Sequence, residues 1–405
     1  MALTVFIVGL AVALSLLARA LLDSVRIPPL VGFMLIGLVL KVADTRWHFL
    51  GEKGHAVMAF LAAVGVITLL FRVGLESDLP GLVRNLPRAG LPWAGNVILS
   101  GVPGYLVAHY LLGFGRIPSL FLAVALTATS VGVSMQVWRE RKALKSQNGE
   151  LLIDIAEMDD ISGVALMAIL FAVVPVLRGG NGEELVAEAA TAGALFVLKL
   201  ILFTVACVLF SRYVERHLTH WFTRICRAPE PMLLIAAVGI MIAAVAARLG
   251  FSPAIGALFA GLVFSRDPAA VKRDAAFDSL YELFTPFFFI GIGLELAPGS
   301  VPSAVGIGIV LLLVSVAGKV IGTGVPALAQ TQATGALLIG TSMVPRAEIT
   351  MIIMRRGHEL GEWAVPPRLY AAMVFVSALT CMTGAWVLHV LLCRWPQQKN
   401  SSQEE

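Results

Sequence analysis

Charged residues are scarce in this sequence of 405 residues: Asp, Glu, Lys and Arg together make up 14% of it, whereas 58% is hydrophobic. Soluble globular domains carry about 25% charged residues, so this composition excludes a soluble fold. The four cysteines lack the spacing of metal or redox motifs, which argues against a zinc site or a disulfide framework. The basic residues stand in short loops, and this excludes a nucleic-acid surface. The composition is that of an integral membrane protein in contact with lipid.

Long apolar runs recur along the whole chain. Most of them are long enough to cross about 30 Å of hydrocarbon as a helix of about 20 residues. They do not alternate every second residue as barrel strands do, so the sequence predicts an all-α bundle. The first run lacks a basic leader and a cleavage site, and we expect it to be retained as a span. About 13 transmembrane helices are predicted, near residues 2–22, 27–43, 54–74, 86–113, 117–137, 147–176, 191–213, 231–249, 252–266, 278–296, 302–325, 331–356 and 366–394.

The distribution of basic residues predicts the orientation. An odd number of spans places the two termini on opposite sides of the membrane. The loops at 138–145, 211–227 and 265–274 are rich in Lys and Arg and fall on one face. The positive-inside rule makes this face cytoplasmic. We therefore expect residues 1–395 to form a single transmembrane unit with its N-terminus outside, followed by a short cytoplasmic tail at 396–405.

Three motifs occur twice, in the same order. They are "PLVGFMLIGLVL" (29–40) with "PAIGALFAGLVF" (253–264), "GLE" (74–76) with "GLE" (293–295), and "TATSV" (127–131) with "GTSMV" (340–344). The two copies lie seven spans apart. Because seven is odd, the second copy is inverted in the membrane relative to the first, which is the inverted-topology repeat of secondary transporters.

The third motif predicts interrupted helices. In transporters with inverted repeats, the substrate site lies near the bilayer midplane at helices that are broken in both halves. The hydroxyl groups of Thr129, Ser130, Thr341 and Ser342 can satisfy freed backbone groups, and Pro345 removes a helical donor. Ser and Thr also bond to the preceding turn of intact membrane helices, so that alternative stays open.

Three charged residues lie deep in predicted spans. Each costs at least about 2.5–3.5 kcal/mol there, so it needs a partner or a water-filled cavity. Asp159 and Asp160 are adjacent on one helix and point about 100° apart, so we expect one to face Lys319 and the other to face the cavity. Burial favours a protonated carboxyl group, whereas a bound cation favours the ionised form. A proton and an alkali cation, which prefers oxygen ligands, therefore compete for the same oxygens.

Four further charges have weaker functional signals. Arg346 and Glu348 in "VPRAEI" are predicted to form a structural core pair that locks the second broken helix. Asp154 and Glu157 lie toward the cytoplasmic entrance of the helix with the two aspartates. Solvation is the default there, although Glu157, with Asp154, is a candidate for the lining of an inner funnel.

The combination of motifs resembles the monovalent cation:proton antiporter superfamily, in its second branch, close to bacterial sodium/proton antiporters of the NapA type. The resemblance rests on "PPLVGFMLIG" (28–37), "LLFRVGLE" (69–76), "TATSVGV" (127–133), "DD" (159–160), "SPAIGALFAGLV" (252–263), "PFFFIGIGLEL" (286–296), "GKVIG" (318–322) and "VPRAEI" (344–349). It implies an NhaA/NapA-like fold with two crossed broken helices and an elevator-type mechanism. It also implies a homodimer built on scaffold spans 2–74 and 191–296, with a mobile core at 86–176 and 302–394.

The resemblance implies a role for each site residue. Asp160 is the principal carboxylate for sodium and protons, and Asp159 pairs with Lys319. Thr129 and Ser130 lie beside them in a broken helix. Members with two aspartates and this lysine exchange two protons for one sodium or lithium ion, without a cofactor, in the cytoplasmic membrane of bacteria. One departure stands out, because Ala347 occupies a position that is usually glycine.

Three other functions were weighed against sodium/proton exchange. A potassium/proton exchanger, or the membrane part of a potassium efflux system, is the closest alternative. An intramembrane aspartyl protease needs its two acids on separate helices, whereas Asp159 and Asp160 are adjacent, so an enzyme is not predicted. A passive channel leaves the aspartates and the buried lysine without a purpose.

Overall fold

The computed structural model of the chain describes residues 2–25, 27–77, 79–179, 184–214, 217, 231–249, 251, 253–265 and 275–397. All regular structure in these residues is helical and none is strand, which confirms the predicted all-α class. The basic residues of the predicted loops at 218–227 and 266–274, and residues 398–405 of the predicted tail, lie outside the described residues.

The described helices range from 10 to 33 residues, apart from the short 3-10 and π segments. Seven segments are long and apolar enough to cross a membrane: Ala2–Ser24, Gly51–Glu76, Arg116–Glu140, Gln147–Gly179, Gly193–Val214, Pro298–Ala327 and Pro367–Arg394. Shorter apolar helices occupy other predicted spans, and the predicted span at 331–356 is divided into two helices. The number of 13 spans therefore stays a prediction.

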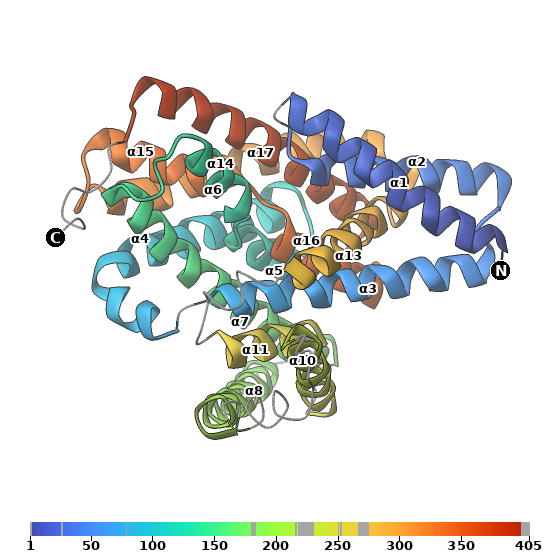
Figure 1. Cartoon of the computed structure of the whole chain (residues 1–405), viewed down its shortest axis with the longest axis horizontal. Coiled ribbons are helices and arrows are strands. Elements are labelled where there is room, and N and C mark those ends of the chain that lie inside the picture. Colours follow the sequence, from blue (N-terminus) through green and yellow to red (C-terminus); the bar gives the residue numbers. More distant parts are fainter. Residues whose placement is uncertain are drawn as a thin grey trace. The chain divides into compact units, whose positions relative to one another are not determined.

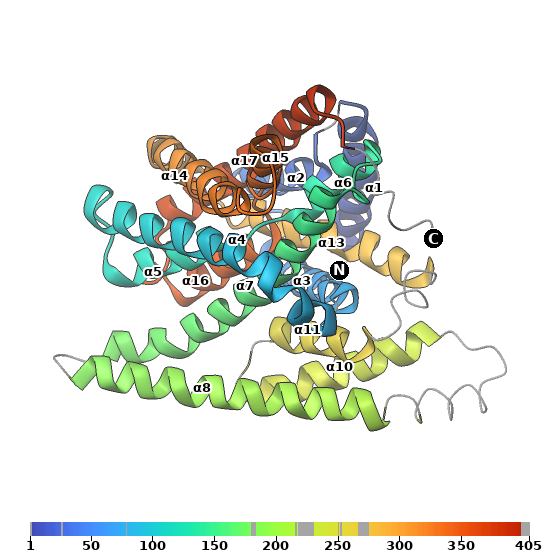
Figure 2. The same cartoon turned by 90° about the vertical axis from the view of Figure 1, so that its left-hand side faces the viewer.

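The first of two compact units comprises residues 1–8, 50–79 and 168–288. Its central element is α11 (Pro253–Phe264), a short and strongly apolar helix. Figure 2 shows α11 beside α8 and α10, and it also packs against α3. Its other helices are the start of α1 (Ala2–Ser24), α3 (Gly51–Glu76), the end of α7 (Gln147–Gly179), α8 (Glu184–Leu209), η2 (Phe210–Val214), α10 (Pro231–Arg248) and the first part of α13 (Ala275–Leu294).

The second unit comprises residues 9–49, 80–167 and 289–405. Figure 1 shows α14 beside α15 and α17, and these helices pack against one another. All nine predicted site residues lie on this unit. Its helices are most of α1, α2 (Pro29–Trp47), α4 (Leu79–Leu106), α5 (Arg116–Thr127), α6 (Val131–Glu140), the first part of α7, the last residues of α13, α14 (Val301–Ala327), α15 (Ala333–Ser342), α16 (Glu348–Leu360) and α17 (Pro367–Arg394).

In the first unit, α3 and α11 touch through glycines of the repeated motifs. A Cβ atom added to Gly261 would lie 2.2 Å from the Phe71 carbonyl oxygen, and one added to Gly74 would lie 2.1 Å from that of Leu258. No side chain fits in either place. Small residues at such crossings let helix backbones approach closely, which is a common way of packing helices in membranes.

In the second unit, α2 and α13 touch in the same way. A Cβ atom on Gly37 would lie 2.0 Å from the Ile290 carbonyl oxygen, and one on Gly293 would lie 2.1 Å from that of Met34. Gly37 corresponds to Gly261 in the first repeated motif, and Gly293 corresponds to the glycine of the other "GLE". Each copy of the first motif thus packs against a copy of the second motif from the other half of the chain.

Two helices of the second unit are interrupted. Residues 128–130 separate α5 from α6, and residues 343–347 separate α15 from α16. The backbone N–H of Ser130 donates a hydrogen bond to the carbonyl of Pro345, with 2.8 Å between nitrogen and oxygen. The Ser134 hydroxyl donates to the carbonyl of Ser342 at 2.6 Å. The interruptions therefore satisfy part of each other's backbone hydrogen bonding, as apolar surroundings require.

Candidate ion-binding site

The helix α7 brings the aspartate doublet to the first interruption. Asp159 is buried, with 1% of its surface exposed, and Asp160 is half-buried. One turn further along, α7 lies against the interruption, where a Cβ atom on Gly163 would make an ordinary van der Waals contact, 3.5 Å from the Cβ of Ala128. The carboxyl groups consequently lie next to backbone that has left the helical conformation.

Lys319 occupies the centre of this site. It is fully buried on α14, and its Nζ lies 3.8 Å from Oδ2 of Asp159. This distance allows electrostatic attraction but exceeds that of a hydrogen bond. The ammonium group instead donates to Oγ1 of Thr129 at 2.6 Å and to the carbonyl of Thr127. The buried charge is therefore shared between Asp159 and the end of α5, whose last carbonyls lack helical partners.

Asn96 is a site residue that the sequence analysis missed. Its Nδ2 donates to Oδ1 of Asp159 at 2.6 Å, and its own Oδ1 accepts a hydrogen bond from Thr323 at 3.3 Å. Both residues are fully buried. The available signals were a single amide in the apolar run of α4 and a threonine one turn beyond Lys319.

Two buried oxygens beside the interruption lack a hydrogen-bond partner in the described part of the chain. They are Oδ2 of Asp159 and the hydroxyl of Ser130, which is 2% exposed. Carboxylate and hydroxyl oxygens are ligands that hard cations prefer. The described residues contain no group of three or more His, Cys, Asp and Glu placed to hold a metal ion. An ion bound by the aspartates would thus take its other ligands from hydroxyls and carbonyls.

Arg346 binds the first interruption instead of pairing with Glu348. Its guanidinium group is fully buried and donates to the Ser315 hydroxyl and to the carbonyls of Leu126 and Ala128, the last at 2.8 Å. Among the described ion pairs, none joins Arg346 to Glu348. Arg346 thus ties α14 and the end of α5 to the second interruption, and the predicted structural role of Arg346 together with Glu348 stays a prediction. Glu348 is half-buried at the start of α16.

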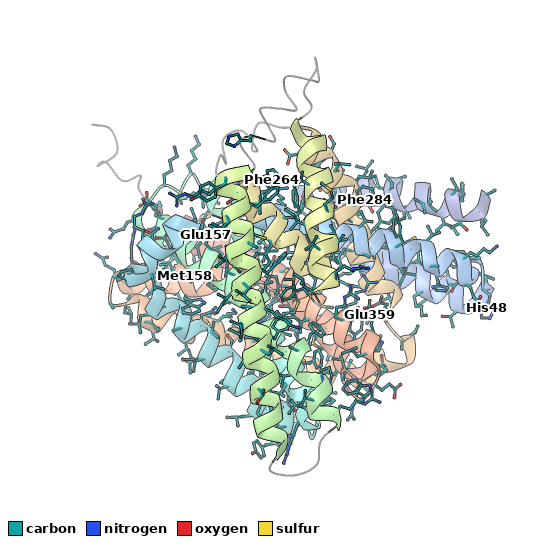
Figure 3. All side chains as sticks on the ribbon, turned by 90° about the horizontal axis from the view of Figure 1, so that it is seen from below. His48, Glu157, Met158, Phe264, Phe284 and Glu359 are labelled. Carbon is teal, nitrogen blue, oxygen red and sulfur yellow. The ribbon has the colours of Figure 1, made fainter. Side chains whose placement is uncertain are left out.

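The two predicted funnel residues lie earlier on α7. Asp154 accepts a hydrogen bond from Asn85 at 2.7 Å and lies 4.0 Å from the Arg88 guanidinium group, so its carboxylate is held by α4. Glu157, labelled in Figure 3, is half-buried. The Asp154 side chain is thus tied to a neighbouring helix, which distinguishes it from a freely solvated acid.

The chain matches one protein family over nearly its whole length. The family described as "Sodium/hydrogen exchanger, transmembrane" matches residues 10–393. The chain belongs to this family. It is therefore a multi-pass membrane protein of the cation:proton antiporter class, as its motifs predict.

The chain also resembles individual antiporters, at low sequence identity. The chain is 27% identical to the high-affinity Na(+)/H(+) antiporter NhaS3 of Synechocystis sp. over 339 residues. This aligned region covers 82% of this chain and 71% of the relative. The chain is 28% identical over 378 residues to the Na(+)/H(+)-K(+) antiporter GerN of Bacillus cereus, covering 92% of each. The solved structure of the sodium proton antiporter MjNhaP1 from Methanocaldococcus jannaschii matches with a TM-score of 0.69 at 14% identity, covering 97% of this chain and 96% of that one. The structural likeness shows that the folds agree.

Proposed function

We propose that this protein is a secondary antiporter that exchanges cytoplasmic sodium, or lithium, for external protons. One observation carries the proposal: a buried carboxylate, Asp159, lies 3.8 Å from a fully buried lysine at an interrupted helix. Charges at such depth are costly and mark ion pathways in membrane proteins. Membership of the sodium/hydrogen exchanger family and the similarity to two Na(+)/H(+) antiporters support this proposal.

In the proposed mechanism, Asp160 is the principal carboxylate and binds either a proton or sodium. Asp159, the neighbouring carboxylate, attracts Lys319 while the site is vacant and exchanges this partner when a proton or cation arrives. When a cation arrives, Thr129 and Ser130 supply further oxygens from the interrupted helix. Because the two cargoes need the same oxygens, binding of one displaces the other, and this competition couples their movements.

For transport, we propose that a core domain (86–176 and 302–394) moves past a scaffold (2–74 and 191–296) that also forms a homodimer. The two crossed broken helices carry the site within the core. The hydrogen bond between Ser130 and Pro345 supports the crossing. The matching glycine contacts in the two units support an inverted repeat, which is the basis of alternating access in transporters of this plan.

The exchange ratio and the orientation belong to the same proposal. Two protons entering for each sodium leaving move one net charge inward. An inside-negative membrane potential contributes about 2.3 kcal/mol per charge per 100 mV, so it drives sodium export directly. From the positive-inside rule, we place the N-terminus outside and the C-terminus in the cytoplasm, with the protein in the cytoplasmic membrane of a bacterium.

Potassium/proton exchange, alone or as the membrane part of a potassium efflux system, is the second candidate. It is favoured by one observation: the relative from Bacillus cereus is named a Na(+)/H(+)-K(+) antiporter. Both cations bind oxygen ligands, so the chemistry of the site does not by itself separate them.

Purified protein in liposomes tests the proposal. Proton flux is measured after sodium, lithium or potassium is added, with the membrane potential clamped and unclamped. We expect flux with sodium and lithium, a response to the potential, and no flux in Asp160→Asn. A response to potassium alone would favour the second candidate. Flux near the wild-type rate in Asp160→Asn would contradict the site assignment.

A further inference from the structure

A polar face of α4 runs along α7 in the second unit. Asn85 bonds to Asp154 at 2.7 Å, Trp93 donates to the Ser162 hydroxyl at 2.9 Å, and Asn96 donates to Asp159 at 2.6 Å. Of these three contacts, only the one made by Asn96 reaches the carboxylate that faces Lys319. Since a neutral amide buried in an apolar helix is costly, its position next to this carboxylate calls for an explanation.

Asn96 lies at the crossing of α4 and α14. A Cβ atom on Gly95 would lie 2.3 Å from the Gly322 carbonyl oxygen, and one on Gly318 would lie 2.6 Å from the carbonyl of Leu99. The two backbones are therefore in direct contact on either side of Asn96. This contact brings the amide within reach of Thr323, the neighbour of Gly322.

The chemistry of the contacts fixes the direction of the amide. An ionised carboxylate only accepts hydrogen bonds, so the NH2 group of Asn96 must face Asp159. Its carbonyl oxygen then faces the Thr323 hydroxyl, which has to donate. Were the amide reversed, two oxygens would face each other in a buried place, at the cost of an unmade hydrogen bond.

Asp159 consequently presents two different oxygens. Oδ1 is occupied by the amide at 2.6 Å, while Oδ2 has no hydrogen-bond partner among the described residues and lies 3.8 Å from Nζ of Lys319. Without the amide, the carboxyl group would be free to rotate and to offer either oxygen.

We propose that Asn96, oriented by Thr323, is a positioning residue that occupies Oδ1 of Asp159 and so reserves Oδ2 for Lys319 or the transported cation. The inference rests on the proposed function for its transport consequences. It assigns a role to two residues on α4 and α14 that act through Asp159. The competing explanation is that Asn96 merely ties α4 to α7.

Kinetics of proton flux in liposomes separate the two explanations. Asn96→Leu keeps the approximate size but removes the amide, and we expect it to raise the KM for sodium about tenfold with a maximal rate within about threefold of the wild type. Thr323→Val removes only the orienting donor and should raise the KM about threefold. Because Thr323 acts through Asn96, the double variant should not exceed Asn96→Leu alone.

Trp93→Phe is the matched control. It removes a hydrogen bond between the same two helices, one turn away, without touching the Asp159 carboxylate. We expect a KM within about twofold of the wild type. If Trp93→Phe raises the KM as much as Asn96→Leu does, or if the effects of Asn96→Leu and Thr323→Val add in full, Asn96 is only a tie between helices and the proposal is overturned.

Infrared spectroscopy of the detergent-solubilised protein gives a readout that needs no transport. Thr323→Val, which alters the amide with the smallest change in packing, should shift a carboxylate stretching band relative to the wild type. The same substitution in an Asp159→Asn background should leave that band region unchanged. An absent shift, or one that persists without Asp159, contradicts the proposal. If the wild type shows no cation-coupled flux, the proposed function fails, whereas the infrared result still decides the role of Asn96.

Discussion

Replacing Lys319 with glutamine removes the positive charge nearest to Asp159. At an effective dielectric constant of about 20, two unit charges 3.8 Å apart attract each other by about 4 kcal/mol. Removing one partner of a buried ion pair typically costs about 3–5 kcal/mol, because the other charge is left uncompensated. We therefore expect Lys319→Gln to lower the free energy of unfolding by about 3 kcal/mol or more.

Denaturant titration in detergent, followed by tryptophan fluorescence, measures this loss. The double variant Asp159→Asn with Lys319→Gln removes both charges, and it should recover most of the lost stability. Lys53→Gln, at an exposed lysine near the start of α3, is the control and should change little. A loss below about 1 kcal/mol in Lys319→Gln, or a double variant less stable than the single one, would refute the reasoning.

Three further predictions concern packing, a second ion pair and transport. Gly261→Ala should destabilise the protein by about 1–3 kcal/mol, because its Cβ would lie 2.2 Å from a carbonyl oxygen, whereas Gly9→Ala, with open space around it, should be neutral in the same titration. Glu295→Gln weakens the contact with Arg355, whose Nη2 lies 2.8 Å from the carboxylate, and should lower the free energy of unfolding by about 1–3 kcal/mol. Adding Arg355→Leu to this variant should not enlarge the loss. Asp160→Asn should abolish cation-coupled proton flux while its unfolding curve stays near that of the wild type. An unfolded variant would contradict the claim that Asp160 serves transport and not stability.

Much of the fold follows from composition and repeated motifs. Apolar runs of helix length predict the all-α class, because an unpaired backbone in lipid is too costly for open strands. The repeated glycines of the two motif sets indicate close helix crossings, and Gly74 and Gly261 indeed meet backbone in the structure. Asp159 and Lys319 stand out by chemistry alone, since charges are rare in apolar helices.

Other features depend on contacts between distant segments, which a sequence does not display. Asn96 looks like an ordinary polar residue until the crossing of α4 and α14 brings Thr323 to its amide. Arg346 and Glu348 have opposite charges and lie close together in the sequence, but the sequence does not show what each side chain contacts. The free carbonyls at the end of α5 become acceptors for Arg346 only in the folded chain. The number of 13 spans stays a prediction, since the interruption at residues 343–347 divides one predicted span into helices of 10 and 13 residues.

Proton release on sodium binding tests the central claim most directly. Sodium is added to the detergent-solubilised protein in a weakly buffered solution, and the pH change is followed with an indicator dye, with choline chloride as the ionic control. If a proton and sodium compete for the carboxylate of Asp160, sodium but not choline will release protons from the wild type, and the release will be lost in Asp160→Asn. Saturable sodium binding without proton release, across the pH range in which the protein is folded, would contradict the account.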